Sequence, residues 1–150
     1  MKIDYLIHSL KNGSESFVLT VEDTIDKFLG VNIEKIDNNK YELSQPFLIE
    51  RLINFLKTDF ETEPRGKERI NPAGKPLLHA DSDGLQRKHK WNYRTAVGMA
   101  GYLQGNTRPD ISMAVHQCAI FVNNPMRSHE RAMCLIVKYL ISTKERGIIY

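Results

Sequence analysis

The residues best suited to binding chemistry lie in one eight-residue stretch, from Arg87 to Arg94. It holds four Lys and Arg side chains, one histidine, and the aromatic residues Trp91 and Tyr93. Basic groups neutralise phosphates and aromatic rings stack on bases or sugars, so this mixture fits a nucleic acid. It fits equally a solvated helix start whose two rings fold onto the core. The candidate phosphate contacts at its start are Arg87, Lys88 and Lys90.

A second candidate lies on the helix that this stretch opens. Arg94, Gly98 and Tyr102 follow one another at intervals of four residues, which places them on one ridge of a helix. Gly98, Gly101 and Gly105 leave this ridge with little side-chain bulk, so another helix or a nucleic-acid backbone could approach it closely. Taken without further information, the pattern favours helix packing over nucleic-acid binding.

The sequence offers no recognisable motif for catalysis or for a metal ion. Asp81–Gly84 shares two carboxylates and a glycine with a calcium loop, but it lacks the remaining ligands and the closing glutamate, which favours a solvated turn. The five histidines have no helical pairing, and Cys118 and Cys134 have no companion at metal-ligand spacing. Neither a nucleophile elbow nor a glycine-rich phosphate loop is recognisable. We predict no catalytic residue, no metal site and no disulfide framework.

Size, composition and charge describe one globular unit with an uneven charge distribution. Of the 150 residues 41% are hydrophobic and 26% are charged, and no apolar run is long enough to span a bilayer. We expect a protein that is neither secreted nor membrane-bound, and both ends of the sequence look cut. Residues 1–60 carry 7 Lys and Arg against 10 Asp and Glu, whereas residues 61–150 carry 14 against 8. The second part is therefore the one expected to meet a polyanion.

The first part of the chain, residues 1–57, is predicted to combine helices with a β-hairpin. Apolar periodicity indicates a short helix over 3–10, and Phe17–Thr20 is a strand candidate. Two β-prone runs, 28–35 and 40–44, predict a hairpin, and a helix is expected from Pro46 to about Lys57. Residues 58–86 are rich in proline and glycine, which indicates a linker or a long loop.

The last part, residues 87–150, is predicted to hold three amphipathic helices. Asn92 caps the first, which runs to about Leu103, and the second runs from Thr107 to about Val122. Ser128 is the expected cap of the third, which ends before Gly147. Three such helices can pack as a small bundle, so the predicted fold class is α+β.

A series of short motifs runs through the chain in a fixed order. It comprises Phe28-Leu29-Gly30-Val31, Leu43-Ser44-Gln45-Pro46-Phe47, Asn71-Pro72-Ala73-Gly74, Asn92-Tyr93-Arg94-Thr95-Ala96-Val97-Gly98, Thr107-Arg108-Pro109-Asp110-Ile111, Ser128-His129 and Gly147-Ile148-Ile149-Tyr150. In order and spacing these motifs resemble the reverse transcriptase region of copia-type LTR retrotransposon polyproteins. The resemblance covers essentially the whole chain. The Tyr-Arg and Thr-Arg-Pro-Asp motifs in register are its most specific part.

The resemblance implies a fragment of a right-hand polymerase without its catalytic centre. Residues 1–57 would be the remnant of the palm, a helix plus β-hairpin with the first thumb helix, and residues 87–150 a mainly helical thumb and connection bundle. In the family the metal-binding aspartates lie in an earlier palm strand and in a Tyr-x-Asp-Asp hairpin, and this sequence contains no Asp-Asp pair. Phosphoryl transfer needs two metals held by such carboxylates. The fragment would thus hold no cofactor, whereas the parent polymerases use Mg²⁺, and it would be inactive alone.

The same resemblance assigns candidate roles to the residues singled out above. Phe28, Leu29 and Gly30 look like the primer-grip element, in which a turn approaches the backbone of the primer terminus. The ridge of Arg94, Gly98 and Tyr102 resembles the thumb helix that lies along the minor groove of the template-primer, and this shifts the expectation from helix packing to binding. The last predicted helix departs from the family, because Glu130 stands where many members carry tryptophan.

The implied partners are an RNA/DNA template-primer duplex and the remainder of the polymerase, namely the fingers, the palm and the ribonuclease H domain, with no membrane. The implied location is cytoplasmic, in a virus-like particle, or nuclear. The alternative function is a co-opted, non-enzymatic helical module that binds a protein or a nucleic acid in its own right.

Overall fold

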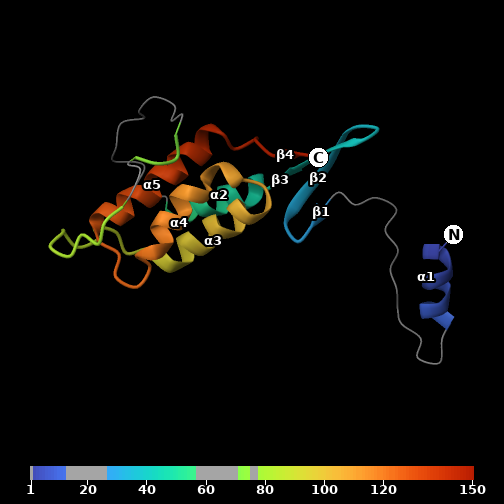
Figure 1. Cartoon of the computed structure of the whole chain (residues 1–150), viewed down its shortest axis with the longest axis horizontal. Coiled ribbons are helices and arrows are strands. Elements are labelled where there is room, and N and C mark those ends of the chain that lie inside the picture. Colours follow the sequence, from blue (N-terminus) through green and yellow to red (C-terminus); the bar gives the residue numbers. More distant parts are fainter. Residues whose placement is uncertain (1, 13–26, 57–70, 75–77) are drawn as a thin grey trace.

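The computed structural model describes residues 2–12, 27–56, 71–74 and 78–150, which fold into helices and a small antiparallel sheet (Figure 1). In chain order the elements are α1 (Lys2–Asn12), β1 (Lys27–Phe28), β2 (Val31–Asp37), β3 (Lys40–Ser44), α2 (Pro46–Phe55), α3 (Tyr93–Asn106), the 3-10 helix η2 (Pro109–Ile111), α4 (Ser112–Ile120), α5 (Arg127–Ser142) and β4 (Ile148–Ile149). The described parts of the predicted linker, 71–74 and 78–86, contain neither helix nor strand. The strand candidate Phe17–Thr20 lies outside the described residues.

Helices α2 to α5 pack around one apolar core. Its fully buried members come from all four helices and include Ile49, Leu52, Ala96, Ala100, Leu103, Val115, Cys118, Met133, Ile136 and Leu140. Helix α2 precedes the 58–86 segment and still shares this core with the helices that follow it. Among the side chains of α1 that the structure describes, residues 5–12, none belongs to this core, and Tyr5 and Leu6 are exposed.

The sheet has the strand order β1-β2-β3-β4, with every neighbouring pair antiparallel. The predicted hairpin of β2 and β3 is confirmed, and β4 returns to pair with β3 after α5. The prediction of one continuous run over 28–35 is wrong, because Leu29 and Gly30 form a two-residue turn between β1 and β2. Both have positive φ, 50° and 80°, as such hairpin turns require.

The predicted start of α3 is confirmed, whereas that of α5 needs correction. The Asn92 side chain accepts a hydrogen bond from the Thr95 N–H at 3.0 Å, which caps α3. At α5 the cap position is Met126, whose N–H donates to Nδ1 of His129 at 2.9 Å, so the predicted Ser128 cap is wrong. The imidazole reaches back to the cap position and leaves the Ser128 hydroxyl buried without a hydrogen-bond partner.

No helix in the described ranges combines the length and the apolarity needed to cross a bilayer.

Candidate nucleic-acid interface

The predicted ridge lies on the open face of α3. Arg94, Gly98 and Tyr102 are exposed, and a Cβ atom added at Gly98, Gly101 or Gly105 would meet no atom of another element within 4 Å. The opposite face of the helix is buried in the core. Among the described residues, therefore, no helix packs against the glycines, and the ridge is free to receive a ligand.

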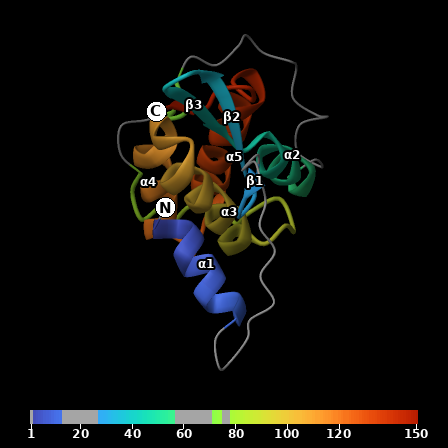
Figure 2. The ribbon, with the colours of Figure 1, turned by 90° about the vertical axis from the view of Figure 1, so that its right-hand side faces the viewer.

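The β1–β2 turn extends this ridge. The Tyr102 hydroxyl donates a hydrogen bond of 2.8 Å to the Leu29 carbonyl, across 73 positions of sequence. Figures 1 and 2 both place β1 beside α3. The side chains of Phe28 and Leu29 are 63% and 73% exposed, so neither is used in the core. Two predicted binding elements from distant parts of the chain thus form one surface, which we call the ridge–turn surface: Phe28, Leu29, Gly30, Arg94, Gly98 and Tyr102.

In the basic cluster before α3, some side chains are exposed and one forms hydrogen bonds within the protein. Lys88 and Lys90 are exposed. Arg87 is committed: its Nε donates to Oε1 of Glu130 at 3.2 Å and its Nη2 donates to the Trp91 carbonyl at 2.6 Å. Its guanidinium also lies 4.5 Å from the centre of the Trp91 ring, a cation–π geometry. The structure therefore gives Arg87 a role in packing, whereas the two lysines keep charged groups at the surface.

The aromatic residues of the cluster belong to the core. Trp91 and Tyr93 are buried and their rings stack with centroids 6.0 Å apart. The Tyr93 hydroxyl donates to the Cys118 carbonyl at 3.1 Å, and burial raises the pKa of this tyrosine. Burial likewise raises the pKa of the Cys118 thiol to about 11. Base stacking by Trp91 or Tyr93 is thereby ruled out, and for these rings the core interpretation is correct.

Glu130 organises the loop that carries the lysines, a role that no pattern in the sequence predicted. Its buried carboxylate accepts hydrogen bonds from the backbone N–H groups of Lys88 and His89, at 2.9 and 3.2 Å, as well as from Arg87. Three donors from one loop converge on a single side chain of α5. The loop before α3 is therefore fixed in the orientation that leaves Lys88 and Lys90 outward.

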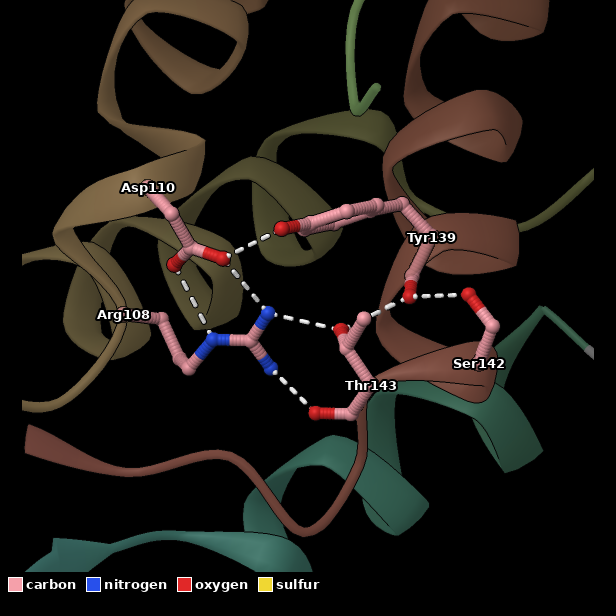
Figure 3. Close-up of polar contacts among 5 residues, drawn as sticks. All are labelled: Arg108, Asp110, Tyr139, Ser142 and Thr143. Carbon is pink, nitrogen blue, oxygen red and sulfur yellow. Dashed lines mark hydrogen bonds and ion pairs between the residues drawn. The ribbon is translucent and has the colours of Figure 1, made fainter. Parts of the chain in front are cut away.

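The Thr-Arg-Pro-Asp motif forms a second polar cluster, in which Arg108 is buried and Asp110 lies at the surface (Figure 3). Arg108 is 2% exposed, and its Nε and Nη2 donate to the two carboxylate oxygens of Asp110 at 3.0 and 2.7 Å. Its Nη1 donates to the carbonyl of Thr143 at 2.9 Å, and its Nη2 also donates to the Thr143 hydroxyl at 2.7 Å. The Tyr139 hydroxyl donates to Asp110 at 2.8 Å. The motif thus ties the α3–α4 connection to the end of α5.

Electrostatics in this cluster stabilise the ionised carboxylate. Burial alone acts to raise the pKa of Asp110, but hydrogen bonds from Arg108 and Tyr139 outweigh it and hold this pKa below its ordinary value. The pKa of the Tyr139 hydroxyl is raised by burial and by its hydrogen bond to Asp110. Donors and acceptors are paired within the cluster, which is typical of a structural role. Adjacent Thr107 donates to Gln45 at 2.9 Å and so joins the end of α3 to the start of α2.

The predicted absence of metal ligands concerns the whole sequence, and the structure describes most of it. Within those ranges no three His, Cys, Asp or Glu side chains are grouped so as to hold a metal ion. At Asp81–Gly84 the Gly84 N–H donates to the Asp81 carbonyl at 3.0 Å, which is the geometry of a turn.

Fold and surface together define an α+β segment in which helix α3 carries open glycines and the exposed Arg94. Comparison with known proteins finds that this chain is similar to parts of transposon polyproteins. The chain is 28% identical over 95% of its length to the Retrovirus-related Pol polyprotein from transposon RE1 of Arabidopsis thaliana, and 25% identical over 95% to that from transposon RE2. It is 27% identical over 84% of its length to a putative transposon Ty5-1 protein of Saccharomyces cerevisiae. The predicted relationship to retrotransposon polyproteins is confirmed.

The chain corresponds to a small part of these relatives, namely 9% of each Arabidopsis polyprotein and 39% of the yeast protein. No family model matches the sequence, and no solved structure matches it.

Proposed function

We propose that this chain is the template-primer-binding segment of a reverse transcriptase encoded by a copia-type retrotransposon. The observation that carries the proposal is the ridge–turn surface. Two separate sequence motifs predict that the ridge and the turn each bind nucleic acid. The hydrogen bond between Tyr102 and Leu29 joins these two parts. The relationship to transposon Pol polyproteins over 95% of the chain supports the same function.

The chemistry of this surface favours recognition of duplex shape over base sequence. The glycines expose backbone along α3, while Arg94 at one end of the ridge supplies a cation for phosphate. Its Nη2 donates to Asn123 at 2.8 Å, which orients the guanidinium without burying it. Contacts of this kind position a protein on the backbone and sugar edges of a duplex and carry little sequence information. An RNA–DNA hybrid is the proposed ligand.

Substitution of Gly98 tests the function directly. Gly98→Leu should lower the affinity for a fluorescein-labelled RNA–DNA hybrid by about tenfold, measured by anisotropy, because a side chain on the open ridge blocks close approach of the groove. The same change should keep or raise thermal stability, since the site is open and leucine favours helix by about 0.8 kcal/mol over glycine. Ala119→Leu, at an exposed position of α4, is the matched control.

Unchanged affinity together with a lower melting temperature in Gly98→Leu would contradict the proposal. That combination would show that the ridge is a packing surface in the intact protein.

The proposed segment binds without catalysing. Its sequence contains no Asp-Asp pair, and a polymerase reaction needs carboxylates to hold the two metals that bridge the attacking and leaving oxygens. We expect no primer extension by the purified chain with a primed RNA template, deoxynucleotides and Mg²⁺. Extension above a no-protein control would show that a catalytic centre is present after all.

A further inference from the structure

We propose that Tyr102 is a positioning residue, whose hydroxyl holds the β1–β2 turn against α3 so that the Leu29 side chain is displayed at the end of the ridge. The inference rests on the proposed function for its ligand. It goes beyond that function, because the Tyr102 hydroxyl acts within the protein, whereas the Tyr102 ring and Leu29 contact the ligand.

The conformation of Leu29 is the first observation. Its φ of 50° lies in the left-handed region, which is uncommon for any residue other than glycine and especially so for a bulky apolar one. A strained residue persists only where the surrounding structure holds it. Yet the Leu29 side chain is 73% exposed, so burial of this side chain does little to hold the turn in place.

The hydrogen bond from Tyr102 supplies a restraint of the required kind. At 2.8 Å it is a well-formed O–H···O bond, and it ends on the carbonyl of the strained residue itself. Tyr102 lies on a regular helix whose opposite face is buried, so the donor is rigidly placed. The turn follows β1, of which the structure describes Lys27–Phe28. The helix therefore fixes the turn.

The hydroxyl and the ring of Tyr102 are used separately. The hydroxyl is committed to Leu29, while the residue as a whole remains 42% exposed. Gly98 lies one helical turn earlier and leaves open space next to it. Leu29, the Tyr102 ring and the gap at Gly98 thus form a stepped apolar surface on the same face of α3 as the exposed Arg94. Such a surface suits the sugar edge of a duplex.

The test separates the hydroxyl from the ring. Tyr102→Phe keeps the ring and removes the hydrogen bond, and Tyr41→Phe is the matched control, because Tyr41 is also 42% exposed but lies on β3. We expect Tyr102→Phe to speed amide hydrogen exchange at residues 28–31, measured by mass spectrometry, without a comparable effect elsewhere. We also expect its affinity for the RNA–DNA hybrid to fall about three- to tenfold, the range of one net hydrogen bond, with the salt dependence unchanged.

Leu29→Asn provides the second arm, because asparagine tolerates the left-handed conformation and removes the apolar side chain. It should weaken hybrid binding without speeding exchange in the turn. Unchanged exchange in Tyr102→Phe would overturn the positioning role, as would faster exchange with unchanged affinity. If the wild-type chain binds no duplex, the proposed function fails, and the exchange measurement alone then decides whether Tyr102 holds the turn.

Discussion

At the scale of single residues, arginine side chains have two different roles in this chain. Arg108 and Arg87 are held by carboxylates and by backbone or hydroxyl acceptors, whereas Arg94 remains exposed on α3. A buried guanidinium is tolerated only when its charge and its donors are satisfied. Arg108 meets that condition through hydrogen bonds to the Asp110 carboxylate and to the carbonyl and hydroxyl of Thr143. The Thr-Arg-Pro-Asp motif therefore contributes to the stability of the fold.

The Asp110 carboxylate gives this cluster a defined pH dependence. Because its pKa is held below the ordinary value in the folded state, its contribution to stability is present above the pKa of the unfolded chain and is lost as the pH falls through the folded-state pKa. Asp110→Asn should be less stable than wild type at neutral pH. The difference in the free energy of urea unfolding should shrink as the solution is acidified.

Glu145→Gln, at an exposed position after α5, is the control for general acid effects and should follow the wild-type curve. A gap between wild type and Asp110→Asn that stayed constant down to strongly acidic pH would show that the ionised carboxylate does not stabilise the fold.

At the scale of elements, local signals were sufficient for α3 and insufficient for the β1–β2 turn. The Asn92 cap and the apolar spacing of Ala96, Ala100 and Leu103 predicted α3 and its buried face. The local pattern missed this turn, which only the resemblance implied, because leucine is a poor indicator of the left-handed conformation. The hydrogen bond that restrains the turn comes from Tyr102, 73 positions away. The spacing of the ridge could be predicted from the sequence, but its junction with the turn could not.

The caps of α3 and α5 differ in a way that substitution can measure. Asn92→Ala should lower the free energy of unfolding by about 1 kcal/mol, because it leaves the Thr95 N–H without its acceptor. Ser128→Ala should be neutral or slightly stabilising, since the buried Ser128 hydroxyl has no hydrogen-bond partner to lose. Chemical denaturation of both variants checks the pair. Equal losses would restore Ser128 as a cap.

At the scale of the whole molecule, tertiary contacts decide which cations of the basic second part can meet a ligand. In the sequence Arg87, Lys88 and Lys90 look equivalent. In the fold Glu130, more than 40 positions further on, pairs with the half-buried Arg87 and fixes the backbone of the two residues after it. No local pattern contains that information. The excess of 14 basic over 8 acidic residues in 61–150 therefore overstates the charge available for binding.

The salt dependence of hybrid binding should distinguish the exposed Lys88 and Lys90 from Arg87, which is paired with Glu130. Removing one cation that neutralises a phosphate should reduce the slope of log K against log salt by about 0.7 to 0.9. Lys88→Ala and Lys90→Ala should each lower the slope by up to that amount and leave thermal stability near wild type, because both side chains are exposed. Arg87→Ala should instead destabilise the fold by about 2–4 kcal/mol, since it leaves the Glu130 charge buried without its ion-pair partner.

Under conditions in which Arg87→Ala remains folded, its slope should match that of the wild type. Anisotropy titrations at several salt concentrations, paired with urea unfolding of the same samples, measure both quantities. A reduced slope with unchanged stability in Arg87→Ala would mean that this arginine leaves Glu130 to contact phosphate in the complex. The ion pair at the start of α3 would then be a resting arrangement that the duplex displaces, and all three basic side chains would belong to the interface.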